Sequence, residues 1–308
     1  MSDPFVSVIV PNYNYARYLD ERFSSILNQT YQNFEIIVLD DHSTDNSIEI
    51  IEKYRDNPHF TQIVVNKENS GKVFSQWHKG FELAKGELIW IAESDDTCTP
   101  DLLERLVCEF QQDKKIVLAF SMTRLFRDDG WSFDIPSIDK KNVIRTEGKR
   151  FISRYMSEGC YITNASSALF RRNTALSLDK QFTTFRNVGD RMFWIELAEH
   201  GKVSIINEYL NFCRRHGSNV TEKNISTGVL QREDKQVMDY LVRKKLISRL
   251  RCLQASSRYV YGHIYKYNFD QSQLREELMK VWEVGLCRKI YLRLLDLKVF
   301  LSKIKTKI

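Results

Sequence analysis

The amino-acid sequence predicts an α/β fold: a mostly parallel, Rossmann-like sheet with helices on both faces, followed by a helical C-terminal extension. Short runs rich in Val and Ile alternate with longer stretches of helical periodicity between residues 6 and 120. Four successive strand-loop-helix units of this kind build a parallel sheet covered on both faces. No glycine-rich phosphate loop follows the first apolar run, so neither a dinucleotide cofactor nor a P-loop is indicated.

The predicted strands are short and apolar, and each ends in a polar loop. They cover residues 6–10, 34–39, 60–65, 87–92, 116–120, 165–170 and 203–206. Helical spacing predicts helices at residues 16–28, 44–55, 71–84, 100–111 and 190–200. Ser43 or Thr44 is expected to cap the second helix, and Thr99 is expected to cap the fourth.

Three acids within four positions follow the apolar run Leu88–Ala92: Glu93, Asp95 and Asp96. Carboxylates at the C-terminal end of a parallel strand lie in the crevice where open α/β sheets bind ligands. Three neighbouring carboxylates also repel one another, so we expect a partner that neutralises them. The simplest partner is a hard divalent cation shared with phosphate oxygens.

The charge of the chain is unevenly distributed. The 308 residues carry a net charge of +6, but residues 222–308 hold 19 Lys and Arg against 9 Asp and Glu, whereas residues 1–221 hold 27 against 31. A basic tail on a mildly acidic body is expected where only the tail meets an anionic surface. The six cysteines lack zinc-ligand spacing, which favours reduced thiols in a cytosolic protein.

The predicted localisation is cytoplasmic, with peripheral binding to the inner face of the cell membrane. The N-terminus has no pattern of a signal peptide, and no apolar run approaches the ~20 residues of a membrane-spanning helix. Near the C-terminus, apolar residues recur at spacings of four and three among basic ones: Ile290, Leu294, Leu297, Leu301, Ile304 and Ile308. An amphipathic helix on an anionic membrane and a packed or coiled-coil helix in an oligomer both fit this seam.

Nucleic acid is not an expected partner, because aromatic residues are not interleaved with a basic groove in any recognisable pattern. The sequence divides into a sheet-forming region, residues 1–221, and a helical basic region, residues 222–308. We expect the second region to serve membrane association or oligomerisation.

Five motifs, taken in order, resemble those of the inverting glycosyltransferases of family 2, which have the nucleotide-diphosphosugar fold called GT-A. They are V-S-V-I-V-P-N-Y-N from Val6, E-I-I-V-L-D-D-H-S-T-D-N-S from Glu35, N-S-G-K from Asn69 with G-E-L-I-W-I-A-E-S-D-D from Gly86, G-D-R-M-F-W from Gly189, and R-R-H-G-S-N-V-T from Arg214. The resemblance therefore covers residues 1–221 and implies a GT-A glycosyltransferase domain there.

The resemblance implies a nucleotide-sugar donor site. The base and ribose would be held by Pro11, Tyr13, Asp40 and Asp41. Lys72 would meet the diphosphate; its structural alternative is a solvated surface lysine. The stretch E-S-D-D looks like the D-x-D element of the family, in which Asp96 would bind Mn²⁺ or Mg²⁺ and Asp95 the ribose or a metal-bound water. For Asp40 and Asp41 the structural alternative is a cap on the following helix.

By the same resemblance Asp190 is the candidate general base, and capping its helix is the alternative. Arg215 and His216 look like the closing segment that covers the diphosphate or ligates metal. The sequence departs from the family pattern at three residues. Glu93 stands where relatives commonly have Asp, Gly189 replaces the usual Glu before the catalytic Asp, and His78 stands where relatives often have Asn. The family varies most between Phe126 and Tyr161, where it recognises the acceptor.

The implied activity is that of a metal-dependent hexosyltransferase of class EC 2.4. Asp190 would take the proton of an acceptor hydroxyl, whose oxygen displaces the nucleoside diphosphate with inversion. The expected donor is a UDP-sugar and the expected acceptor a glycan or lipid-linked hydroxyl in surface polysaccharide synthesis. The alternative is a non-catalytic nucleotide-sugar-binding or scaffold subunit of a polysaccharide assembly complex. A sugar-1-phosphate nucleotidyltransferase would need a glycine-rich loop after the first strand, which is absent.

Overall fold

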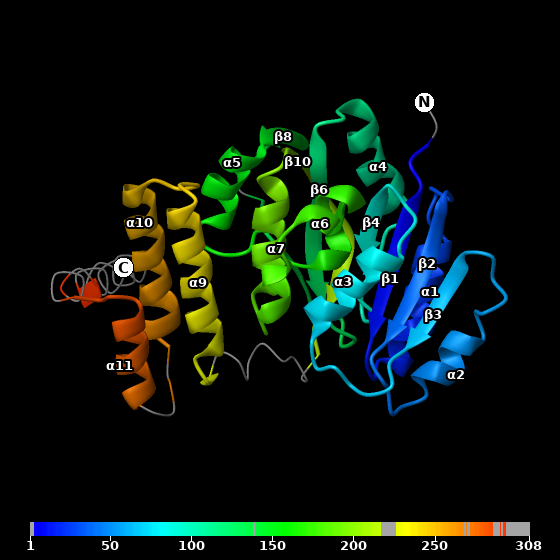
Figure 1. The fold of residues 1–308 in the computed structure, drawn as a ribbon, viewed down its shortest axis with the longest axis horizontal. Helices are drawn as coiled ribbons and strands as arrows, with labels where there is room; N and C mark the ends of the chain where they lie inside the picture. The colour runs from blue at the N-terminus through cyan, green and yellow to red at the C-terminus, as the bar shows by residue number, and fades with distance from the viewer. Residues whose placement is uncertain are drawn as a thin grey trace. The chain divides into compact units, whose positions relative to one another are not determined.

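The computed structural model describes residues 3–137, 139–216, 226–267, 269, 272–285, 290 and 292–293. The chain forms two compact units (Figure 1). The first combines Met1–Phe151 with Cys160–Ser218, and the second combines Ile152–Gly159 with Asn219–Ile308. The short segment 152–159 therefore belongs with the C-terminal helices, an assignment that no pattern in the sequence indicated.

The first unit is built on one large sheet whose N-terminal half is parallel. Its first four strands are β1 (Val6–Asn12), β2 (Phe34–Asp40), β3 (Phe60–Val65) and β4 (Leu88–Ile91), and they lie in the order β3-β2-β1-β4. The register pairs Asn12 with Asp40, so β1 and β2 end at the same level. The polar loops that follow these strands therefore share one edge of the sheet, as predicted.

The other half of the sheet is mixed. Strand β9 (Ala168–Arg171) lies between β4 and β6 (Ile116–Phe126) and runs antiparallel to both, while β10 (Lys202–Arg214) runs parallel to β6. Three short antiparallel strands complete the sheet: β5 (Thr97–Cys98), β7 (Ser132–Asp134) and β8 (Val143–Glu147). The predicted α/β fold with a mostly parallel sheet is confirmed, and these short polar strands were missed because they lack an apolar alternation.

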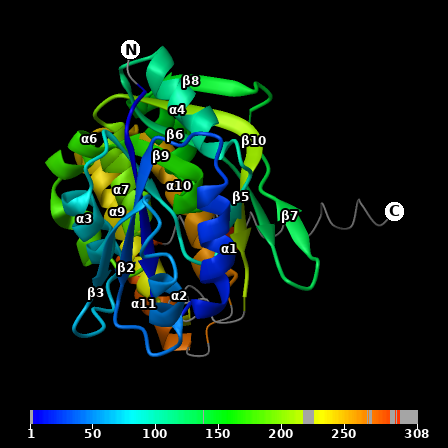
Figure 2. The ribbon, with the colours of Figure 1, turned by 90° about the vertical axis from the view of Figure 1, so that its right-hand side faces the viewer.

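Helices cover both faces of the sheet (Figure 2). Val8 and Val10 of β1 face a core that includes Leu19 of α1 (Ala16–Leu27) and Leu106 of α4 (Leu102–Gln112). Ile9, which points to the other face, packs against Gly80 of α3 (Val73–Leu83). The aromatic cluster on that face joins α3 and β9 to η3 (Lys180–Thr184) and α7 (Gly189–Ala198) through Phe81, Phe170, Phe182, Phe193 and Trp194.

Two predicted helix caps are wrong. Helix α2 (Ser47–Glu52) has Asn46 at its N-cap rather than Ser43 or Thr44, and α4 has Asp101 rather than Thr99. Ser43 instead donates hydrogen bonds to the carboxylate of Asp40, and the Thr99 amide bonds the carbonyl of Leu210 in β10. Ser43 is therefore engaged by a local contact and Thr99 by a tertiary one, and sequence periodicity shows neither.

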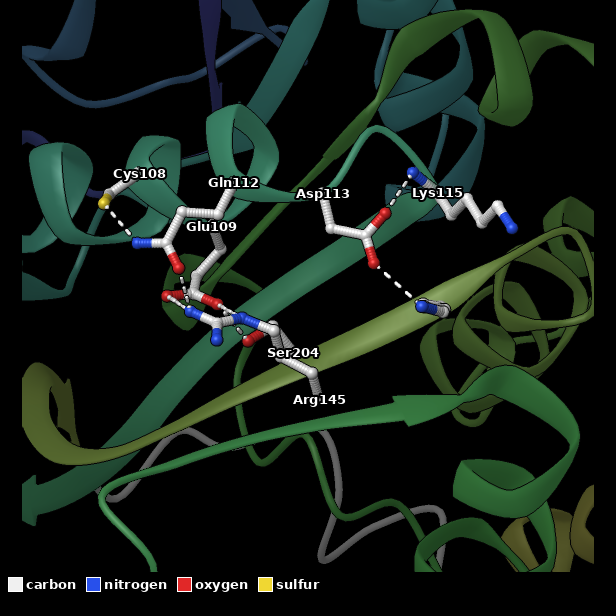
Figure 3. A network of polar contacts seen from close by, with 8 residues as sticks. Cys108, Glu109, Gln112, Asp113, Lys115, Arg145 and Ser204 are labelled. Atoms are coloured by element: carbon white, nitrogen blue, oxygen red, sulfur yellow. Dashed lines mark hydrogen bonds and ion pairs between the residues drawn. The ribbon is translucent and has the colours of Figure 1, made fainter.

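A buried carboxylate fastens α4 to the edge of the sheet (Figure 3). Glu109 accepts hydrogen bonds from Arg145 of β8 at 2.6 and 2.9 Å and from the hydroxyl of Ser204 in β10 at 2.7 Å. Asp113, one turn further along, accepts from the ammonium group of Lys202 at 2.9 Å. Because Glu109 is almost fully buried and fully hydrogen-bonded, this network is structural.

The second unit is helical, as predicted for the extension. Its principal helices are α9 (Val229–Arg243), α10 (Arg249–Val260) and α11 (Ser272–Val281), with π-helical turns at η1 (Ile152–Met156) and η4 (Tyr261–Tyr265). Tyr259 stacks on Trp282 at 4.6 Å and donates to Asp234 at 2.6 Å. Most of the predicted apolar seam, residues 290–308, lies outside the described residues. None of the described helices is both long and apolar enough to cross a membrane.

Candidate active site

The acidic loop, residues 93–96, connects β4 to β5 and is held in place by hydrogen bonds to two neighbouring elements. The hydroxyl of Ser94 donates to the carbonyl of Pro11 in β1 at 2.8 Å. The backbone N–H of Glu93 donates to the hydroxyl of Ser166 at 3.0 Å, in the short 3₁₀ segment η2 (Ala165–Ser167). Pro11, which was predicted to help hold the nucleotide-sugar, is thus buried in β1. It contacts the acidic loop through its backbone carbonyl.

The structure brings together three of the predicted site residues at this loop. Asp96 is only 2% exposed and accepts from Ser166 Oγ at 2.6 Å and from the Arg214 backbone N–H at 3.2 Å. Asp95 Oδ2 lies 3.0 Å from Nε2 of His216. The two carboxylates are therefore oriented by neighbours on η2 and at the end of β10, elements far apart in the sequence.

The loop concentrates negative charge in a buried place. Burial, followed by the charges of Asp95 and Asp96, raises the pKa of Glu93 to about 8. Burial and the charge of Asp95 likewise raise the pKa of Asp96. The guanidinium of Arg22, fully buried in α1, opposes both shifts. Because Asp95 raises the pKa of both neighbours, the acids of the loop repel one another, and a positive partner would relieve that repulsion.

Asp40 and Asp41 order the neighbouring loops, and neither caps α2. Asp40 is fully buried and accepts from Asn12 Nδ2 at 2.7 Å as well as from Ser43. Asp41 accepts from Ser70 through both its N–H and its hydroxyl, at 3.0 and 2.8 Å. Burial acts to raise the pKa of Asp41, but hydrogen bonds from Ser70 and its neighbours outweigh burial and lower it.

Tyr13 and Lys72 are the exposed members of the predicted donor site. The ring of Tyr13 is 44% exposed just beyond β1. Lys72 is the N-cap residue of α3, where its N–H donates to Ser70 Oγ at 3.2 Å. Gly71 before it has φ +59°, a left-handed conformation that favours glycine. Lys72 is exposed, and within the described part of the chain its ammonium group makes no ion pair.

Asp190 lies in the first turn of α7, one residue into the helix. Its Oδ1 accepts from the N–H of Arg191 at 2.6 Å, whereas the N-cap position belongs to Val188. The missing Glu before this Asp has a steric explanation. A Cβ on Gly189 would lie 2.4 Å from a ring carbon of Phe74 and 2.5 Å from the carbonyl of Phe182, so no larger residue fits.

Arg214 is a site residue that the sequence analysis missed. Only 6% exposed, it donates from Nε to the Asp95 carbonyl at 3.0 Å and forms ion pairs with Glu21 and Asp128. Arg215, which was predicted instead, contacts the Phe126 carbonyl through its N–H at 2.8 Å. The predicted strand ended at residue 206, whereas β10 continues to 214. Because successive side chains of a strand point to opposite faces, a strand predicted to this length would have distinguished the two arginines.

His216 lies among aromatic rings beside the acidic loop. Its ring stacks with Tyr18 at 5.9 Å and meets the edge of Tyr15 at 5.6 Å. Burial and the surrounding acids raise the pKa of Tyr15. The rest of the predicted closing segment, residues 217–221, lies outside the described residues.

The sheet and the helices that cover it match the GT-A fold of glycosyltransferases. The chain belongs to glycosyl transferase family 2, whose sequence profile matches residues 7–173.

Among individual relatives, the chondroitin synthase of Pasteurella multocida is 27% identical over 229 residues, which is 73% of this chain. The chain spans only 22% of the length of that synthase. Among solved structures, Staphylococcus aureus TarS in complex with UDP-GlcNAc has a TM-score of 0.68 at 16% identity, covering 91% of this chain and 81% of TarS. The mannosyltransferase PcManGT from Pyrobaculum calidifontis, with GDP-Man and Mn²⁺, has a TM-score of 0.58 at 17% identity, covering 98% and 81%. At these identities the structural likeness shows the fold alone.

Proposed function

We propose that this protein transfers a sugar, with inversion, from a nucleotide-diphosphosugar to a hydroxyl of a glycan or lipid-linked acceptor. The observation that carries the proposal is the acidic loop, in which Asp95 and Asp96 are oriented by His216, Ser166 and Arg214 at the carboxyl edge of the sheet. A UDP-sugar is the proposed donor, supported by the TarS complex with UDP-GlcNAc. The chondroitin synthase relative supports a role in surface polysaccharide synthesis.

The acidic loop suits a divalent cation, Mn²⁺ or Mg²⁺, and PcManGT was solved with Mn²⁺. The described residues contain no group of three or more metal-ligating side chains, so the protein would supply few ligands and the diphosphate and water the rest. Asp96 would hold the cation, and its oxygens are already fixed by Ser166 and Arg214. When bound, the cation would neutralise charge on the departing diphosphate.

The side chains of the chain divide the remaining work. We assign Asp190 as the base that takes the proton from the acceptor hydroxyl. Pro11, Tyr13, Asp40 and Asp41 shape the place for base and ribose, where the exposed ring of Tyr13 offers a stacking face. Lys72, Arg215 and His216 supply positive charge or hydrogen-bond donors to the diphosphate as it leaves.

A screen of nucleotide-sugars tests this proposal without knowledge of the acceptor. Each donor is added with Mn²⁺ or Mg²⁺, and the unfolding temperature and the release of nucleoside diphosphate are measured. We expect one donor to stabilise the protein, chelation of the metal to remove that stabilisation, and Asp96→Asn to do the same. If no nucleotide-sugar raises the unfolding temperature, the proposal is contradicted. Stabilisation with no release of nucleoside diphosphate, even by transfer of the sugar to water, would instead favour a non-catalytic binding subunit.

We assign residues 1–221 to donor binding and catalysis and residues 222–308 to membrane association or oligomerisation. The excess of basic residues in the second region supports an anionic partner on the cytoplasmic side. A lipid-linked acceptor fits an enzyme held at such a surface.

A further inference from the structure

A turn joins α9 to α10 (Figure 1), and the residues on and beside it expose apolar and basic side chains together. We call this surface the α9–α10 corner and define it by its exposed residues Val242, Arg243, Lys244, Lys245, Arg249, Leu250 and Leu253. Leu250 is 66% exposed and Leu253 56%, the two most exposed large apolar side chains among the described residues. Large apolar side chains gathered on a polar background indicate a binding surface.

The two leucines are not required by the helical core. Ser248 caps α10, accepting from the N–H of Arg251 at 3.2 Å, and this fixes which face each later residue occupies. Leu246 and Ile247, just before the cap, are buried. Leu250 and Leu253, three residues apart on the helix, share a face that points away from the core. Their exposure therefore follows from the helix register.

The stretch of sequence that carries the leucines is basic. No acidic residue occurs between Asp239 and Asp270. Two basic residues of this stretch, Arg251 and Arg258, are paired with Glu158 at 3.1 and 2.9 Å. The basic residues of the corner itself have no acidic partner within the described residues: Arg243, Lys244, Lys245 and Arg249.

We propose that the α9–α10 corner binds the surface of an anionic lipid bilayer. The leucines would enter the boundary between headgroups and acyl chains, while the basic side chains meet the lipid phosphates. A second copy of the corner is a poor occupant, because a two-fold contact would place like charges against each other. A nucleic acid would use the charges but leave the leucines in water. The corner is separate from the apolar seam of residues 290–308 and does not depend on the catalytic assignments.

Vesicle flotation of the full chain tests the proposal. Phosphatidylcholine vesicles are compared with vesicles in which one third of the lipid is phosphatidylglycerol, and binding to the anionic vesicles alone is expected. Leu250→Ser with Leu253→Ser should weaken that binding at least about tenfold. Lys244→Glu with Lys245→Glu should weaken binding to the anionic vesicles more than the leucine substitutions do. Lys53→Glu with Lys114→Glu, an equal change of charge on exposed residues of the first unit, is the control and should retain more binding.

Three outcomes would overturn the proposal. They are no flotation of the wild-type chain, flotation of the leucine variant equal to that of wild type, and a loss of flotation in the control equal to that of the Lys244→Glu, Lys245→Glu variant. A leucine variant that converts an oligomer to a monomer without changing flotation would assign the corner to self-association instead. The unfolding midpoint of each variant checks folding. If the double leucine variant does not fold, Leu253→Gln alone gives the same comparison.

Discussion

Glu93 and Asp96 are acids whose ionisation the folded protein opposes, and the pKa of Glu93 is about 8 against an ordinary value of 4.5. Between these pH values the folded state holds a proton that the unfolded chain has lost. The contribution of Glu93 to the free energy of unfolding therefore falls as pH rises from 4.5 to 8.

Glu93→Gln removes this ionisation while keeping the size of the side chain. In chelator, the variant should be more stable than wild type at pH 8 and similar at pH 4, where both side chains are neutral. The difference should reach a few kcal/mol at most, since one pKa unit corresponds to about 1.4 kcal/mol. Urea unfolding at the two pH values measures it. A variant less stable than wild type at pH 8 would show that the carboxylate is stabilised there.

Asp190→Asn tests the proposed base. The amide keeps the shape of the side chain and can still accept the Arg191 N–H bond, but it cannot take a proton at neutral pH. Turnover should fall by ~10²–10⁴-fold, the usual worth of general-base catalysis, while donor affinity changes little. Steady-state kinetics and donor titration separate the two quantities. Near-normal turnover would remove Asp190 from the mechanism.

At the scale of elements, Gly189 fixes how closely α7 approaches α3. Gly189→Ala would push its methyl group into Phe74 and the Phe182 carbonyl, displacing the turn that carries Asp190. We expect a loss of about 1–3 kcal/mol in unfolding free energy, the usual cost of overpacking, together with lower turnover. Gly159→Ala is the matched control, because nothing lies within 4 Å of the position that its methyl group would take. Equal effects of the two substitutions would contradict this steric account.

The elements that could be predicted from sequence are those whose burial repeats along the chain. Strands β1, β2 and β4 are apolar on both faces, so their positions are evident from composition alone. Strand β7 is exposed at all three residues and pairs only because β6 extends past the sheet core. Acids after strands were likewise predictable as a group. Ser166 and Arg214 were not, because only tertiary structure brings η2 and β10 to the acidic loop.

At the scale of the whole molecule, the charge of the sequence is divided between a mildly acidic body and a strongly basic end. If residues 222–308 meet an anionic bilayer, their binding depends on charges exposed to solvent. Raising the salt concentration from about 0.1 M to about 1 M shortens the screening length from about 10 to about 3 Å and should abolish flotation. Donor binding at the buried acidic loop should change far less. Flotation that is insensitive to salt would exclude an electrostatic mode.

Arg214 contacts the acidic loop at Asp95 and Asp96 and also forms an ion pair with Asp128, in the turn between β6 and β7. The family resemblance leads us to expect acceptor recognition between Phe126 and Tyr161, the region that contains Asp128 and β7. Replacing the β6–β7 hairpin with that of a relative, in order to change the acceptor preference, would therefore also alter contacts to the acidic loop. A replacement that keeps an acid at position 128 preserves the ion pair with Arg214. A replacement without that acid removes one of the ion pairs of a buried guanidinium. Position 128 is thus a constraint on how freely acceptor preference can be re-engineered in this chain.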